Sequence, residues 1–359
     1  MPNDNVKVIA GMSGGVDSAV AALLLKKKGY DVTGVTLRTW EADSREVSRC
    51  CETDDAERSA RHMGIPYYVL NSSGDFSEKV KKPFIDSYLK GITPNPCIEC
   101  NRYVKWERML YYAEVFGAEY IATGHYASVK KLENGRFTLK RALHAEKDQT
   151  YMLCLLTQEQ LSRTIFPLSD LSKEEVRRIA AEEGLSIAAK PDSQEICFVP
   201  DKDYAGYIER NTSLPLPGEG DFIDTDGNVI GRHKGIHHYT VGQRRGLGLP
   251  LGYPAFVTKI CPENNTVVVG DEASLMDRSV SVGSLNFMGI EPLEPGDEIR
   301  GFAKIRYRQE AKAATAVMTD ENTLRIDFDE PLRAGAPGQG AVLYDEEGLV
   351  LLGGVIKAG

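Results

Sequence analysis

Short apolar runs alternate with amphipathic stretches along the first half of the chain. Residues 6–12 (VKVIAGM) form an apolar run that ends in a glycine turn, which is typical of a buried strand. Residues 17–30 then predict a helix that begins at Asp and Ser and ends at a glycine. The same reasoning predicts strands at 30–40, 67–71 and 118–126, and helices at 54–66, 75–91, 104–117 and 172–184. The last of these helices begins with a Ser172/Glu175 capping box. Strands that alternate with helices predict an α/β fold, with a doubly wound parallel sheet covered on both faces.

The pattern changes after about residue 205, where glycine, proline and short β-branched runs replace the helical periodicity. Apolar strand-like runs occur at 267–270, 297–308, 314–319, 323–328 and 340–356. We therefore predict an α/β domain over 1–205, a β-rich domain over 206–275 and a barrel-like β domain over 276–359. No internal repeat interrupts this order.

Composition places the chain among soluble globular proteins. It has 359 residues, 42% of them hydrophobic and 26% charged, and its apolar runs are far too short to cross a bilayer. The first residues lack the charged and apolar pattern of a secretory signal, so we expect a cytoplasmic protein with no membrane partner. In that compartment the seven cysteines are expected to be reduced, catalytic or metal-bound rather than a disulfide framework.

The net charge of −9 argues mildly against a nucleic-acid partner, but the charge is unevenly spread. Residues 227–262, here called the acid-free segment, contain five Lys or Arg residues, three His residues and no Asp or Glu. Binding of a polyanion depends on the local field, so an acidic chain can carry a basic face. Charge alone leaves open whether this segment binds nucleic acid or is a solvated loop.

A glycine-rich turn, AGMSGGVDSA at 10–19, lies where the first predicted strand leads into the first helix. Backbone N–H groups in such a turn, together with the helix N-terminus, favour an anion. Ser13 and Ser18 can donate hydroxyl hydrogen bonds to phosphate, and Asp17 could hold Mg²⁺. An ordinary tight turn with a polar cap is the alternative. S-G-G-x-D-S directly after an apolar strand resembles the loop of the PP-loop ATP pyrophosphatases, which implies ATP cleavage between the α and β phosphates.

Two stretches of the sequence contain cysteines that are candidates for metal binding or thiol chemistry. NPCIECN (95–101) is expected to form a loop holding Cys97 and Cys100, and KPDSQEICFVP (190–200) holds Cys197. A C-x-x-C pair can bind a metal, close a disulfide or present a thiol, and the local string does not decide among them. Cys154 and Cys261 lie in apolar company, which predicts core positions.

Five separated stretches, TPNPCIECN, DSQEICF, ATGHYA, KDQTYML and GIHHYTVGQRRGLG, together resemble the bacterial tRNA-specific 2-thiouridylases. The resemblance covers essentially the whole chain. It implies 2-thiolation of the wobble uridine in tRNAs for Lys, Glu and Gln. ATP would adenylate the uracil O2, a Cys197 persulfide would supply sulfur, and Cys100 would attack that persulfide, leaving a Cys100–Cys197 disulfide. A sulfur-donor protein, such as a cysteine desulfurase or a relay protein, is the implied partner.

The resemblance also implies roles for individual residues. The ATP site would comprise Gly11, Met12, Ser13, Gly14, Gly15, Val16, Asp17 and Ser18, with Leu37 and Gly124 near the nucleotide. Asn95, Pro96 and Cys97 would face the target base. The remaining tRNA contacts would be His125, Lys147, Asp148, Gln149, Arg306, Tyr307 and Gln339.

Cys97 departs from the family pattern, in which many members carry Asp at this position. The substitution allows an alternative in which Cys97, Cys100 and Cys197 hold a [4Fe–4S] cluster with one open iron. Two further alternatives are a PP-loop amidotransferase or ligase acting on a small molecule, and a tRNA-binding protein without catalysis. A small-molecule amidotransferase or ligase would not require Cys100 and Cys197. A tRNA-binding protein without catalysis would not require an intact PP-loop.

Overall fold

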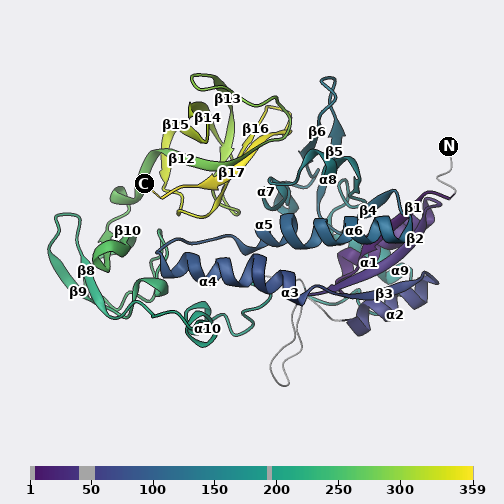
Figure 1. Cartoon of the computed structure of the whole chain (residues 1–359), viewed down its shortest axis with the longest axis horizontal. Coiled ribbons are helices and arrows are strands. Elements are labelled where there is room, and N and C mark those ends of the chain that lie inside the picture. Colours follow the sequence, from purple (N-terminus) through teal and green to yellow (C-terminus); the bar gives the residue numbers. More distant parts are fainter. Residues whose placement is uncertain (1–4, 40–52, 192–195, 359) are drawn as a thin grey trace.

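The computed structural model describes residues 5–39, 53–191 and 196–358 (Figure 1). Its N-terminal part is built on a parallel five-stranded sheet in the order β3-β2-β1-β4-β7. The strands are β1 (Lys7–Gly11), β2 (Asp31–Arg38), β3 (Tyr67–Asn71), β4 (Tyr120–Ala122) and β7 (Thr164–Ile165). Strand order reverses between β1 and β4, and ligands of doubly wound sheets bind at the carboxyl ends beside such a reversal.

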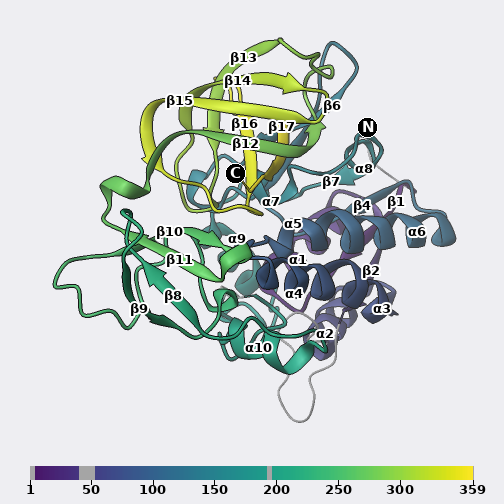
Figure 2. The ribbon, with the colours of Figure 1, turned by 60° about the vertical axis from the view of Figure 1, so that its left-hand side comes forward.

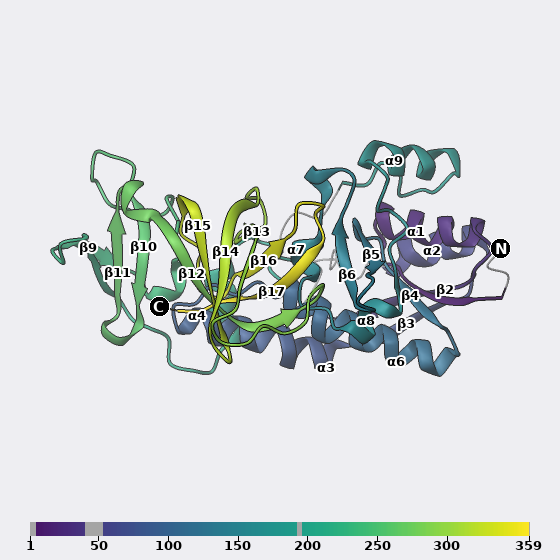
Figure 3. The ribbon, with the colours of Figure 1, turned by 90° about the horizontal axis from the view of Figure 1, so that it is seen from above.

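Helices cover both faces of this sheet, as Figure 3 shows from above. Val8 and Ala10 of β1 belong to a core shared with α1 (Val16–Lys27), α2 (Thr53–Met63) and α9 (Lys173–Glu182). Ile9, between them, points to the opposite core. That core includes residues of α6 (Glu107–Phe116). This alternation confirms the predicted doubly wound sheet.

Two long helical stretches carry a π-helical segment in the middle. The first runs through α3 (Ser73–Phe76), η1 (Ser77–Lys81) and α4 (Lys82–Leu89). The second runs through α5 (Pro96–Cys100), η2 (Asn101–Trp106) and α6. The expectation of a loop at 95–101 is therefore wrong. The side chain of Asn95 accepts hydrogen bonds from the backbone N–H groups of Cys97 and Ile98, and proline at the first helical position needs no hydrogen-bond acceptor.

Shorter elements complete the first domain. They are the hairpin β5 (Ala127–Lys131) and β6 (Phe137–Arg141), then η3 (Ala145–Lys147), α7 (Thr150–Leu153), α8 (Gln158–Ser162) and α10 (Tyr204–Asn211). α9 begins at the predicted capping box, in which Ser172 and Glu175 each bond the other's backbone N–H. None of the helices within the described residues combines the length and apolar character needed to span a bilayer.

Two β-rich units follow, which confirms the predicted architecture (Figure 2). The central unit is a sheet in the order β10-β11-β8-β9. Its strands are β8 (Gly220–Ile223), β9 (Val229–His233), β10 (Phe256–Cys261) and β11 (Thr266–Gly270). Three short 3-10 helices accompany them: η4 (Ile236–His238), η5 (Pro262–Asn264) and η6 (Ala273–Leu275). The last unit is a closed barrel in the order β12-β15-β14-β13-β16-β17. Its strands are β12 (Met276–Phe287), β13 (Glu298–Lys304), β14 (Lys312–Asp320), β15 (Thr323–Arg333), β16 (Gly340–Tyr344) and β17 (Val350–Ile356).

The barrel shares a hydrophobic core with the first domain. Val342, Tyr344 and Val350 of the barrel are fully buried in the same cluster as Trp106 and Tyr151. Alternate residues of β16, such as Leu343, point instead into the barrel's own interior. The barrel is therefore packed against the helices that follow the cysteine stretch, which fixes its position relative to Cys97 and Cys100.

Candidate active site

The PP-loop connects the end of β1 to the start of α1 at the reversal of strand order. Gly14 has a φ of +76°, a left-handed conformation that favours glycine, and Gly15 is the N-cap of α1. Ser18 folds back over the loop, since its hydroxyl accepts the N–H of Ser13 at 3.1 Å and donates to the carbonyl of Gly15 at 3.0 Å. The first N–H groups of α1 have no intrahelical acceptor and point toward this loop, where they suit an anion.

Gly124, in the turn that follows the neighbouring strand β4, lies against the PP-loop. A Cβ atom at this position would approach the backbone N of Ser18 to 2.6 Å and the carbonyl carbon of Asp17 to 2.7 Å. Only glycine therefore allows the two segments to approach so closely. Met12 is buried on the inner side of the loop, Ser13 is exposed and Leu37 packs at the edge of the core under α6. The structure thus brings the predicted ATP-site residues together at one sheet edge.

Asp17 is engaged by two residues from distant parts of the chain. The ammonium of Lys173, at the start of α9, lies 2.7 and 2.8 Å from the two carboxylate oxygens. The hydroxyl of Tyr126 donates to Oδ1 at 2.7 Å. Lys173 is only 7% exposed, so its ammonium is largely removed from water, whereas the Asp17 side chain is 31% exposed. Sequence reasoning did not find Lys173, because its capping-box context identifies a helix start and nothing more.

A second lysine, Lys190, also reaches the PP-loop. Its ammonium donates to the carbonyl of Gly14 at 3.1 Å and to the carboxylate of Asp55 at 2.6 Å. Partial burial lowers the pKa of Lys190. The lysine fixes the segment that leads toward Cys197 next to the nucleotide loop. Asp192 to Glu195, the intervening part of the predicted DSQEICF stretch, lie outside the described residues.

Cys100 and Cys197 belong to the same hydrophobic cluster, although they come from distant parts of the sequence. Cys100 is buried at the end of α5, and Cys197 is half-buried. The cluster is rich in aromatic rings: Phe84 and Phe198 meet edge to face at 5.2 Å. Cys97, one helical turn before Cys100, is exposed. The two cysteines that are predicted to be catalytic thus share one apolar environment, and Cys97 faces solvent.

The three cysteines do not converge on a position where one single metal ion could bind them all. Among the described residues, one set of three or more His, Cys, Asp and Glu side chains has its ligand atoms within 4.8 Å of one another, and it is Glu209, His237 and His238. Cys97, Cys100 and Cys197 are all described and form no such set. These three thiols are therefore not arranged as ligands of one single ion. Cys154 and Cys261 are buried, as predicted for core residues.

The barrel holds the segment that precedes α5. The side-chain amide of Gln339 donates to the carbonyl oxygens of Thr93 at 2.9 Å and Pro94 at 3.2 Å. The N–H of Thr93 donates to the carbonyl of Pro337, and the hydroxyl of Tyr151 donates to the carbonyl of Gly340 at 3.0 Å. Asn95, which was expected to face the target base, caps α5 with its side chain, and Pro96 is buried.

His125 follows β4 at the carboxyl edge of the sheet. Its ring lies 5.6 Å from that of Trp106, and its Nδ1 is 2.8 Å from the hydroxyl of Thr123. Burial, with a smaller contribution from the charge of Lys105, lowers the pKa of His125 to about 3. The imidazole is therefore neutral at physiological pH.

The stretch 147–149 divides into residues with different environments. Asp148 is buried, and its carboxylate accepts hydrogen bonds from the hydroxyl and N–H of Thr150 at the start of α7. The side-chain oxygen of Gln149 accepts the N–H of Tyr126 at 3.0 Å, and Tyr126 in turn bonds Asp17. Lys147 is half-exposed at the end of η3. Both residues thus have internal roles in this structure. Asp148 holds the start of α7, and Gln149 links α7 to the PP-loop through Tyr126.

Arg306 and Tyr307 lie just after β13, on the side of the barrel that faces the other two domains. The guanidinium of Arg306 donates to the carbonyl of Ala334 and would meet a Cβ atom placed on Gly242 at 2.7 Å. Burial lowers the pKa of Arg306. The pKa of Tyr307 is raised by burial first, and then by the nearby negative charges of Asp148 and a Cys97 thiolate. Tyr307 is therefore close to the cysteine helix, whereas Arg306 packs against the central domain.

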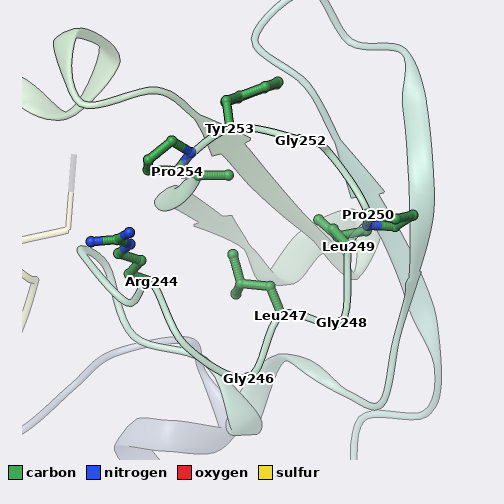
Figure 4. Close-up of a pocket in the computed structure, with 10 residues that line it drawn as sticks. Arg244, Gly246, Leu247, Gly248, Leu249, Pro250, Gly252, Tyr253 and Pro254 are labelled. Atoms are coloured by element: carbon green, nitrogen blue, oxygen red, sulfur yellow. The ribbon is translucent and has the colours of Figure 1, made fainter.

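The acid-free segment includes the turn 244–255, which surrounds a cavity of about 630 Å³ in the central domain (Figure 4). Arg244, Leu247 and Tyr253 are among the residues that line it. Arg244 and Arg245 are exposed, and Tyr253 is 54% exposed. None of the predicted catalytic or nucleotide-binding residues lines this cavity. The turn therefore presents basic and aromatic groups on a surface separate from the PP-loop.

The parallel sheet, with its PP-loop at the reversal of strand order, and the two β-rich units define the class of protein. The sequence model of the protein family described as "tRNA methyl transferase HUP domain" matches residues 6–201. The family model of a tRNA methyl transferase PRC-barrel domain matches residues 211–271. The family model of an aminomethyltransferase beta-barrel domain matches residues 277–356. The chain is thus a HUP-type α/β protein of the PP-loop class that carries two β-barrel-type domains.

Curated relatives identify the family within this class. The chain is 50% identical to tRNA-specific 2-thiouridylase MnmA of Lachnoclostridium phytofermentans, over 98% of this chain and 99% of that protein. It is 48% identical to the proteins of the same name from Clostridioides difficile and Acetivibrio thermocellus, over 98% of this chain and 98% and 99% of theirs. The chain belongs to the tRNA-specific 2-thiouridylase family, which confirms the resemblance drawn from its sequence.

Proposed function

We propose that this protein catalyses ATP-dependent 2-thiolation of the wobble uridine of tRNAs for Lys, Glu and Gln. Family membership supports the reaction class, and the shared environment of Cys100 and Cys197 is the structural observation that carries the proposal. Any alternative that uses only the PP-loop leaves unexplained why two distant cysteines lie in one cluster.

The PP-loop binds and aligns ATP in this proposal. Backbone N–H groups at the start of α1 and the hydroxyl of Ser13 contact the phosphates, with Leu37 and Gly124 beside the nucleotide. Mg²⁺ would accompany the phosphates near Asp17, where it would compete with Lys173 for the carboxylate. The uracil O2 attacks the α-phosphorus, pyrophosphate leaves, and C2 becomes electrophilic because its oxygen is now part of an AMP leaving group.

Sulfur transfer then uses the two clustered cysteines. A sulfur-donor protein loads Cys197 as a persulfide, and the half-buried position of Cys197 leaves part of the side chain accessible. The Cys100 thiolate attacks Sγ of Cys197, which forms a Cys100–Cys197 disulfide and releases HS⁻. HS⁻ adds to C2 and expels AMP together with the original oxygen. A thiol reductant must supply two electrons to reopen the disulfide before the next turnover.

tRNA would contact both β-rich units. Exposed Arg244 and Arg245 suit phosphate contacts, and exposed Tyr253 suits stacking on a base or ribose. Lys147, His125, Arg306 and Tyr307 remain proposed contacts near the target uridine. The uridine must leave the anticodon stack to reach Cys97 and Cys100, at a cost of roughly a few kcal/mol.

The test is thiolation of an in vitro transcribed tRNA by protein purified without oxygen, with bound iron recorded for each sample. Cys100→Ser and Cys197→Ser should abolish 2-thiouridine formation, while Cys97→Ser and iron-free wild type should retain it. Loss of activity in all three variants, in parallel with loss of iron, would support the cluster mechanism instead. ATP cleavage that is independent of tRNA, without thiolation, would assign the chain to the small-molecule ligases.

A further inference from the structure

A compact His-His-Glu group lies at the junction between the first domain and the central domain. Glu209 is near the end of α10, and His237 and His238 are adjacent residues of η4. Oε1 of Glu209 is 3.3 Å from Nε2 of His237 and 3.1 Å from Nε2 of His238. Two ring nitrogens from one segment therefore converge on a single carboxylate oxygen of another.

These separations match those expected among ligands of one small divalent ion. Zn–N and Zn–O bonds of about 2.0–2.1 Å in a tetrahedral site place neighbouring ligand atoms about 3.3 Å apart. The three ligand atoms lie within 4.8 Å of one another. Two imidazoles and one carboxylate form a donor set that Zn²⁺ prefers, and they leave a fourth position for water.

Burial differs among the three side chains. His237 is only 2% exposed, and its Nδ1 is a buried atom without a hydrogen-bond partner in the described structure. The side chain of His238 is 24% exposed and that of Glu209 is 41% exposed, so an ion can reach the group from solvent.

We propose that Glu209, His237 and His238 form a binding site for a divalent transition-metal ion of the Zn²⁺ class. The ion tethers α10 to η4 by replacing the protons that otherwise lie between the two rings and the carboxylate. The proposal stands independently of the thiolation mechanism.

The site lies next to the cysteine cluster through α10. Tyr207 and Ile208, which precede Glu209, are buried in the cluster that contains Cys100 and Cys197. The hydroxyl of Tyr204 donates to the carbonyl of His238 at 2.7 Å. An ion at Glu209 therefore holds the helix that packs against Cys197, and its removal loosens both contacts together.

Cobalt binding to the untagged, chelator-treated full chain tests the proposal. Co²⁺ in a site of nitrogen and oxygen ligands gives visible d–d bands without the near-ultraviolet thiolate charge-transfer band that cysteine ligation adds. We expect one equivalent with this spectrum, displacement by Zn²⁺, and a rise of several degrees in the thermal midpoint. Glu209→Gln and His238→Gln, at accessible positions, should each lose the bands and the rise.

A second His–Glu pair, half-buried His144 and exposed Glu146 with Nδ1 and Oε1 3.9 Å apart, provides matched controls. His144→Gln and Glu146→Gln should bind cobalt like the wild type. Cobalt bands that persist in Glu209→Gln and His238→Gln would overturn the proposal. Absence of bound cobalt in the wild type would do the same, and it would identify the group as an ion-pair cluster only.

Discussion

Gln339 and Thr93 are 246 residues apart in sequence and are joined by a hydrogen bond of 2.9 Å from the side-chain amide to the carbonyl oxygen. The same amide reaches Pro94 at 3.2 Å. Because Asn95 immediately follows and caps α5, the barrel helps to set where the cysteine helix begins. A residue predicted as a tRNA contact thus also positions the segment that carries Cys97 and Cys100.

Replacing Gln339 separates these two roles. In Gln339→Ala, two carbonyl groups lose their donors, at about 1 kcal/mol each, and the start of α5 shifts. We expect kcat for thiolation to fall about tenfold, because small displacements of reacting groups are costly, while the Kd for tRNA stays within about twofold. A weakened Kd with unchanged kcat would assign Gln339 to tRNA contact instead.

Gly124→Ala should disable the nucleotide site. The added methyl would meet the backbone of Asp17 and Ser18 at 2.6–2.9 Å, so the PP-loop must move. The contacted atoms belong to the backbone, which cannot move aside as the end of a flexible side chain can. We therefore expect the affinity for ATP, measured by equilibrium dialysis, to fall at least tenfold. Gly74→Ala is the matched control, since a Cβ there meets nothing within 4 Å and the residue lies in helix α3. Equal ATP binding by both variants would contradict the predicted site.

The sequence was sufficient to predict the sheet, the PP-loop and the capping box at Ser172, because each depends on neighbouring residues. The helical start at Asn95 and Pro96 could also have been predicted, since Asn followed by Pro is an N-terminal helix signal. Lys173, Lys190 and Gln339 reach their partners only through tertiary packing, and no local pattern marks them. The burial of Asp148 could not be predicted from neighbouring residues either, because it depends on packing against the barrel.

The Asp17–Lys173 pair should show strong coupling in a double-mutant cycle. Asp17→Asn leaves Lys173 as a largely buried charge without its carboxylate, and Lys173→Met removes the cation from Asp17. Each single change should lower the free energy of unfolding by roughly 3 kcal/mol, whereas the double variant should lose much less than the sum. Urea denaturation followed by a first-domain tryptophan, Trp106, provides the measurement. Strict additivity would show that the two charges act independently.

The half-buried His125 should make stability depend on pH. Its pKa is about 3 in the folded protein and about 6.5 in an unfolded chain, so the unfolded state binds one more proton between these values. Stability is therefore fully present above about pH 6.5 and falls as the pH decreases toward 3, by up to about 1.4 kcal/mol per pH unit. His125→Gln should reduce this slope in urea titrations between pH 5 and 7.5. An unchanged slope would mean that other groups, such as His233 and His238, account for it.

The basic turn of the central domain should account for part of the salt dependence of tRNA binding. Arg244 and Arg245 are exposed, and each phosphate contact they make releases counterions when tRNA binds. Replacing both with Gln should reduce the slope of log K against log salt by about one to two, and should weaken binding about tenfold at low salt. Lys28→Gln removes one charge at an exposed position after α1 and is the control, which should leave the slope unchanged. If the double variant binds tRNA with the wild-type slope, the turn does not contact the phosphate backbone, and the tRNA path must instead follow the barrel.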